Sequence, residues 1–89
     1  MAEATKAGNV MAVNILFFGA TADLAGERTL SIEIANGATA DDVFESILKQ
    51  FPSLRTHKLL FSVNQEYSTG DETIVDGDEL AVFTAVSGG

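Results

Sequence analysis

The chain has 89 residues, of which 13 are acidic and 5 are basic, giving a formal net charge of −8. Such a surface repels phosphate backbones, so nucleic acid is disfavoured as a partner, while a basic protein partner or mere solubility both fit. The 46% hydrophobic residues can fill one modest core, and the absence of cysteine excludes disulfides, thiol nucleophiles and thiolate metal sites.

Residues 1–10 mix small and polar side chains without a hydrophobic period, which predicts a flexible lead-in before a single domain over residues 11–85. This lead-in lacks the apolar region of a signal peptide, and no later apolar run is long enough to span a bilayer. We therefore expect a cytoplasmic protein without membrane contact.

The first strand-forming run extends from Val13 to Phe18 and carries apolar side chains on both faces, as a central strand does. The glycine-bounded residues 19–26 predict a loop with a helical turn. Residues 29–34 then alternate apolar and polar side chains, which indicates a half-buried strand nearer an edge of the sheet.

A helix is predicted after the turn at Asn36-Gly37, with Thr39 as its N-cap and two aspartates in its first turn. Its apolar residues recur at helical spacing and form one stripe that faces the sheet. The stripe consists of Ala40, Val43, Phe44, Ile47, Leu48 and Phe51. Pro52 ends the helix.

The last third of the chain alternates strands and turns after a polar, irregular stretch at residues 53–58. Residues 59–64 predict a strand, and residues 65–68 either continue it or turn into a short neighbour. Two glycine-containing turns precede a final strand over residues 79–85, where Leu80 and Val82 alternate with Ala81 and Phe83.

This order of elements predicts an α+β roll of the β-grasp kind, with a mixed sheet of about five strands and one main helix packed on one face. The first and last strands are expected to lie side by side, and the other face of the sheet to meet water. If Val13, Ile15 and Phe17 face the helix together with Leu80 and Val82, then the residues that face away from it are Leu16, Phe18, Ala81 and Phe83.

The exposed phenylalanines are expected near the C-terminal tail, with Tyr67 as a third member if its strand runs alongside. Contiguous apolar surface on a small domain marks a partner site. Two alternatives stay open: a loop that covers this face, or a register shifted by one residue, which exchanges the two faces.

The tail, Val86-Ser87-Gly88-Gly89, follows an apolar run directly. Because glycine has no side chain, the tail can extend through a narrow slot and deliver the Gly89 carboxylate to a partner's active site. A chance glycine pair or a cloning remnant is the alternative.

No other residues predict an enzyme acting alone. His57 lies in a polar segment, which is typical of a solvated loop histidine. The adjacent acidic pairs have local structural roles and lack the spacing of a calcium loop, so no metal site is expected.

Several motifs together resemble the family of molybdopterin synthase small subunits, which are ubiquitin-like sulfur carriers. The resemblance covers the chain from about Val13 to its end. The motifs are residues 14–18 (NILFF), 51–54 (FPSL), 62–67 (SVNQEY), 76–81 (DGDELA) and 87–89 (SGG). The acidic turn and the Gly-Gly tail are shared with related carriers, including the thiamine one, whereas the SVNQEY and NILFF stretches point more narrowly.

The resemblance implies that a ubiquitin-activating-like adenylyltransferase uses ATP to adenylate Gly89, and that sulfur transfer then gives a thiocarboxylate. The charged tail would enter the large subunit and donate sulfur to cyclic pyranopterin monophosphate. It further implies a heterotetramer with the large subunit, no permanently bound cofactor, and Phe18, Tyr67 and Phe83 as apolar contacts for both partners.

Two other functions stay open at this stage. One is a sulfur carrier for another pathway, such as thiamine, or a ubiquitin-like modifier whose tail ends in an isopeptide bond to lysine. The other is a plain β-grasp interaction domain whose Gly-Gly end has no role.

Overall fold

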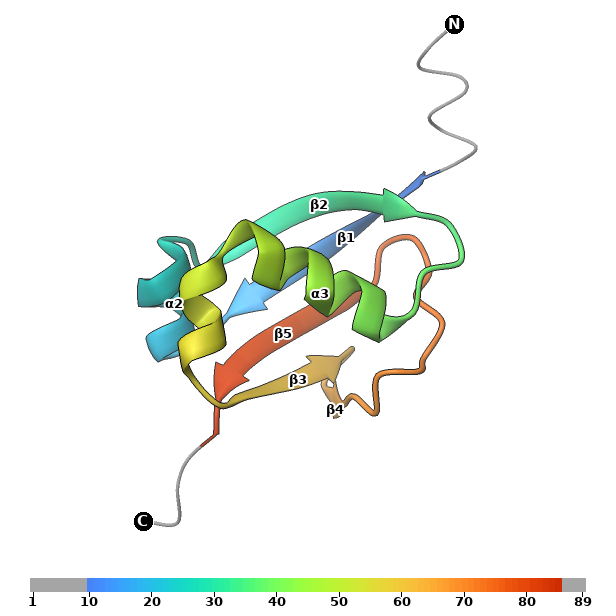
Figure 1. The fold of residues 1–89 in the computed structure, drawn as a ribbon. Coiled ribbons are helices and arrows are strands. Elements are labelled where there is room, and N and C mark those ends of the chain that lie inside the picture. Colours follow the sequence, from blue (N-terminus) through green and yellow to red (C-terminus); the bar gives the residue numbers. More distant parts are fainter. Residues whose placement is uncertain (1–9, 86–89) are drawn as a thin grey trace, which may run out of the picture.

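The computed structural model describes residues 10–85, which form a five-stranded mixed sheet with one main helix across one face (Figure 1). The strand order is β2-β1-β5-β3-β4; β1 and β5 are parallel and the other neighbours antiparallel. The elements are β1 (Val10–Phe17), α2 (Ala20–Ala25), β2 (Thr29–Ala35), α3 (Ala40–Gln50), the 3-10 helix η1 (Pro52–Thr56), β3 (Leu59–Val63), β4 (Glu66–Tyr67) and β5 (Glu79–Thr84). The predicted α+β roll with adjacent first and last strands is confirmed.

The predicted tail, residues 86–89, and all but the last residue of the predicted lead-in lie outside the described residues. Within residues 10–85, no helix is both long enough and apolar enough to cross a membrane.

The first strand begins at Val10, three residues before its predicted start at Val13. Pairing with β2 extends it, because Val10 lies opposite Ala35 and Met11 opposite Ile34. The backbone N–H of Ala12 also donates to Asp76 Oδ1 at 2.7 Å. These partners are distant in sequence, so the local composition of residues 10–12 gave no sign of the strand.

The main helix α3 begins and ends where its sequence predicts. Thr39 is the N-cap: its hydroxyl accepts from the N–H of Asp42 at 3.4 Å, and the Asp42 carboxylate accepts from the N–H of Thr39 at 2.9 Å. This capping box pairs two N–H groups at the start of the helix. The ring of Phe44 stacks on that of Phe61 in β3 at a centroid distance of 3.9 Å, which joins helix to sheet.

The hydrophobic core lies between α3 and the sheet. Its central members, from β1 and β5, are Val13, Ile15, Phe17, Leu80 and Val82. The stretch predicted as irregular contributes as well, since it forms η1 and buries Leu54 completely. The prediction failed there because Leu54 stands alone among polar residues, without a period to reveal it.

The loop over residues 68–74 holds the start of α3. The N–H of Asp41 donates to the carbonyl of Gly70 at 2.9 Å, and that of Ala40 donates to the carbonyl of Glu72 at 2.9 Å. Gly70 has φ +99°, and a Cβ placed there would lie 2.5 Å from Asp41 Oδ1. The positive φ therefore favours glycine at this position, and a Cβ here would also displace the Asp41 carboxylate.

The carboxylate of Glu72 closes the same loop. It accepts from the hydroxyl of Ser68 at 2.8 Å and from the N–H groups of Thr69 and Gly70, each at 3.0 Å. These donors, with Ser68 foremost, hold the pKa of Glu72 below its ordinary value because they favour the charged form.

Candidate functional site

The candidate site is the face of the sheet opposite α3. Side chains from β1, β3, β4 and β5 and from the residue after β1 converge there, because cross-strand partners share a face. We call this set the open-face patch; it consists of Leu16, Phe18, Leu60, Tyr67, Ala81 and Phe83. The pairs Leu16–Ala81 and Leu60–Phe83 lie directly opposite each other. The patch runs across four of the five strands.

The exposure of the patch agrees with the predicted faces and differs in detail. Phe18 is 50% exposed and Tyr67 71% exposed. Phe83 is less exposed than these two residues. Its side chain is half-buried because its ring packs against that of Tyr67, with the centroids 5.9 Å apart. Ala81 lies on the central strand β5 and is buried. Its small side chain lies between those of Leu16 on β1 and Ser62 on β3. No described segment covers the most exposed part of this face.

The position of Phe18 is set where β1 gives way to α2. Its N–H donates to the carbonyl of Val82 at 3.0 Å, so the residue continues beside β5 after the strand has ended. The buried hydroxyl of Thr21 lies 2.6 Å from the carbonyl oxygen of Phe18 and 2.9 Å from that of Val82, within donating distance of both. Gly19, at φ +60°, makes the bend between strand and helix. Phe18 is thus held on a rigid corner.

The position of Tyr67 is set by the turn between β3 and β4. Asn64 and Gln65 both have positive φ, 48° and 74°, as a two-residue hairpin turn requires. The Asn64 side chain donates to Asp78 Oδ1 and accepts from the N–H of Glu79, each at 3.0 Å. These bonds tie the hairpin to the start of β5. Tyr67 lies on the edge strand β4, and its ring packs against that of Phe83 on β5.

Charges are divided along the direction of the strands. Arg28 precedes β2 and Lys58 precedes β3, so both lie at the end where β1 and β5 finish. Asp76 and Asp78, in the turn before β5, lie at the opposite end. The end from which the chain continues toward Gly89 is therefore the less acidic end of a molecule with net charge −8.

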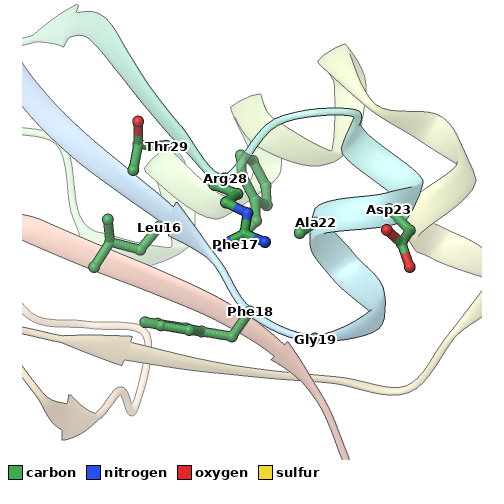
Figure 2. Close-up of a pocket in the computed structure, with 8 residues that line it drawn as sticks. All are labelled: Leu16, Phe17, Phe18, Gly19, Ala22, Asp23, Arg28 and Thr29. Atoms are coloured by element: carbon green, nitrogen blue, oxygen red, sulfur yellow. The ribbon is translucent and has the colours of Figure 1, made fainter.

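A pocket of about 380 Å³ adjoins the open-face patch at this end. Figure 2 shows its lining, which includes Leu16 and Phe18 from the patch, Gly19 and Ala22 from the strand-to-helix corner, and Arg28. The Arg28 side chain extends toward α2 across the end of β1, and Asp23 points to the outer side of that helix. Among the described residues Arg28 forms no ion pair, whereas Arg55 is paired with Glu45 at 2.7 Å.

Other candidate chemistry is not assembled. Within residues 10–85, no group of three or more His, Cys, Asp or Glu side chains is placed to hold a metal ion. His57 is exposed, and its Nδ1 lies 2.9 Å from the hydroxyl of Thr56. No buried polar side-chain atom in the described part of the chain lacks a partner.

Two residues of this region were not predicted from the sequence. Leu60 belongs to the patch because it points away from Leu59 and Phe61, and the alternation along its strand could have revealed it. Arg28 carries no comparable signal, since only the meeting of β1, β2 and α2 forms its pocket. Gly88 and Gly89, together with Val86 and Ser87, lie outside the described residues.

The ThiS family model matches residues 15–89 of the chain. A molybdopterin synthase sulfur carrier subunit from Chlamydomonas reinhardtii is 31% identical over 83 residues, covering 89% of this chain and all of that protein. Among solved structures, SAMP1 from Haloferax volcanii superposes with a TM-score of 0.77 at 28% identity, over 88% of this chain and 99% of that one.

The complex of subunits 1 and 2 of the molybdopterin-converting factor from Helicobacter pylori also contains a chain of this fold. It superposes with a TM-score of 0.63 at 23% identity, over 89% of this chain and 100% of that one. At this identity the likeness concerns the fold alone.

Proposed function

This chain belongs to the ThiS family, and from that membership we propose that it is the sulfur carrier subunit of a molybdopterin synthase. The similarity of the Chlamydomonas reinhardtii carrier subunit over its whole length supports the assignment. The observation that carries it is the geometry of β5, which runs through the open-face patch and finishes beside Phe18, five residues before Gly89. A protein that docks on this patch therefore also reaches the end of β5, from which the chain continues toward Gly89.

In the proposed cycle the Gly89 carboxylate attacks the α-phosphorus of ATP in an activating enzyme, and pyrophosphate leaves. Sulfur at the oxidation level of sulfide then attacks the acyl carbon, AMP leaves, and Gly89 carries a thiocarboxylate. The carrier needs no catalytic side chain of its own, since the activating enzyme supplies ATP and the catalytic groups. In the large subunit the thiocarboxylate sulfur then bonds to a carbon of cyclic pyranopterin monophosphate. Water hydrolyses the resulting thioester, so the sulfur stays on the pterin and Gly89 returns as a carboxylate.

The open-face patch is proposed as the surface that both partners use in turn. It is apolar, contiguous and largely exposed at Phe18 and Tyr67, which is the composition of an interface core. Hydrogen bonds fix the backbone at the corner after β1 and at the β3–β4 turn. The backbone that carries Phe18 and Tyr67 therefore need not be rearranged on docking, which lowers the conformational cost. The large subunit and the adenylyltransferase are the partners that this proposal requires.

The test of the chemistry is the intact mass of the chain after incubation with ATP, a sulfur source and its activating enzyme. We expect a gain equal to the exchange of one oxygen for one sulfur, located on Gly89. Gly89→Val should fold normally by circular dichroism and fail to gain this mass. Normal charging of Gly89→Val, or no gain in the wild type with an enzyme that charges another carrier, contradicts the proposal.

The test of the surface is Phe83→Asp, which places a charge in the middle of the patch. We expect binding of the large subunit to be lost while the protein stays folded, because Phe83 is half-buried and lies outside the core between sheet and helix. Lys49→Glu, on the opposite side of the sheet in the last turn of α3, is the control. If Phe83→Asp binds the large subunit as wild type does, the open-face patch is not the docking surface.

A second candidate function is a ubiquitin-like modifier, and the similarity to SAMP1, an archaeal modifier by its name, favours it specifically. The chemistry differs in the last step, where a lysine amine instead of a sulfur donor displaces AMP. Conjugates of the chain through Gly89 to lysine, found by mass spectrometry in cells, would establish this function. Their absence, together with thiocarboxylate formation, would leave the carrier role alone.

A further inference from the structure

We propose that the pocket beside the open-face patch receives a carboxylate side chain from the docking protein, with Arg28 as the residue that pairs with it. The inference rests on the proposed function, because it assumes that a protein docks on the patch. It assigns to Arg28 a part in the choice and orientation of that protein.

The first support is the continuity of the pocket with the patch. Leu16 and Phe18 line both, so a protein that covers the patch also closes the mouth of the pocket (Figure 2). The volume of about 380 Å³ accommodates one side chain of the partner with accompanying water. An interface core next to a smaller polar recess is the arrangement in which one inserted side chain fixes the register.

The second support is the charge of the pocket. Arg28 is exposed and has no ion pair among the described residues, although the chain carries 13 carboxylate side chains against 5 basic ones. Asp23 is also part of the lining, yet its carboxylate points to the outer side of α2. A guanidinium that stays unpaired on so acidic a surface is available for an anion brought from outside, and its planar fork matches a carboxylate.

The third support is the position of Arg28 in the charge pattern. The opposite end of β5 carries Asp76 and Asp78, which repel an acidic partner group. Asp23 and Glu27 lie beside Arg28 and offset part of its charge, so the attraction of a partner carboxylate is local to the guanidinium. At the other end the same carboxylate meets Asp76 and Asp78 and is repelled. Such a pattern orients docking and excludes wrong partners more than it adds affinity.

The experiment compares wild type, Arg28→Gln and Arg28→Glu in binding to two purified proteins from the same organism: the large subunit and the activating enzyme. Lys49→Glu is the matched control, since it changes the formal charge equally from the helix side of the sheet. Titrations are run at about 0.1 M and about 1 M sodium chloride, because salt screens an exposed pair. Thermal melting confirms that each variant is folded.

We expect Arg28→Glu to weaken binding of one partner by about tenfold or more at the lower salt, because attraction becomes repulsion. Arg28→Gln should weaken it less, the control should match wild type, and most of the difference should vanish at the higher salt. A lysine in place of the partner's carboxylate should restore binding to Arg28→Glu, which identifies the group that enters the pocket.

Three results would overturn the proposal. The first is wild-type binding of both proteins by Arg28→Glu, and the second is a loss of affinity that is equally large at the higher salt. The third is that no replacement of a partner carboxylate by lysine restores binding to Arg28→Glu. A loss seen only with ATP present would assign the pocket to a phosphate of the nucleotide, which also refutes a protein carboxylate. If Phe83→Asp abolishes binding while Arg28→Glu does not, only this inference fails. If neither variant affects binding, the docking surface itself is wrong.

Discussion

Tyr67 offers the sharpest test of the docking surface, because most of its side chain is free in the isolated domain. It is 71% exposed, so with about 200 Å² for a tyrosine side chain, roughly 140 Å² remain for a partner to cover. At about 25 cal/mol per Å² this area sets an upper limit of roughly 3.5 kcal/mol. The actual loss is smaller than this limit, because the tyrosine hydroxyl is polar and alanine keeps the Cβ. We therefore expect Tyr67→Ala to weaken binding by about 2 kcal/mol, roughly 30-fold in Kd.

The same substitution should change the stability of the fold much less. The ring of Tyr67 packs against that of Phe83, at 5.9 Å between centroids. Such aromatic pairs contribute about 0.5–1.5 kcal/mol. We therefore expect the free energy of unfolding, measured in urea, to fall by about 1 kcal/mol while the binding loss, measured by calorimetric titration of the large subunit, is about twice as large.

Val75→Ala is the matched control for surface hydrophobicity. Val75 is 58% exposed, but it lies before the turn that leads into β5 and outside the open-face patch. Its truncation should leave Kd unchanged. Wild-type affinity in Tyr67→Ala, or an equal loss in Val75→Ala, would refute the assignment of this face as the docking surface.

Three further predictions concern the fold that supports this surface. Leu54→Ala should lower the free energy of unfolding by about 2–5 kcal/mol in urea, because the side chain is fully buried; a loss under 1 kcal/mol would contradict its place in the core. Gly70→Ala should cost about 1–3 kcal/mol and more than Gly77→Ala, since both have positive φ but only Gly70 lies against another side chain; equal losses would exclude that contact. The charged Glu72 stabilises the fold fully above its ordinary pKa of 4.5, and this contribution is lost as the pH falls through the lowered pKa of the folded state. Glu72→Gln should therefore have a lower free energy of unfolding than wild type at neutral pH and approach wild type in acid. A difference that stays constant from neutral to acid pH would refute this linkage.

Many elements were predictable from the sequence because local patterns specify them. The alternation over residues 29–34 predicted β2, and the helical spacing from Ala40 with Thr39 before it and Pro52 after it predicted α3. The faces of β1 and β5 followed from the same alternation once the two strands were taken as neighbours. Phe18, Tyr67 and Phe83 could therefore be placed on one surface before their positions were known.

Features that depend on partners distant in the chain could not be predicted, because they form only when separate elements pack together. β1 begins at Val10 because β2 and Asp76 provide its hydrogen bonds, and Leu54 is buried because the chain folds back over the end of the core. The pocket at Arg28 exists only where two strands and a short helix meet. Sequence periodicity reports which side of an element is apolar, whereas register and the packing of separate elements determine what that side touches.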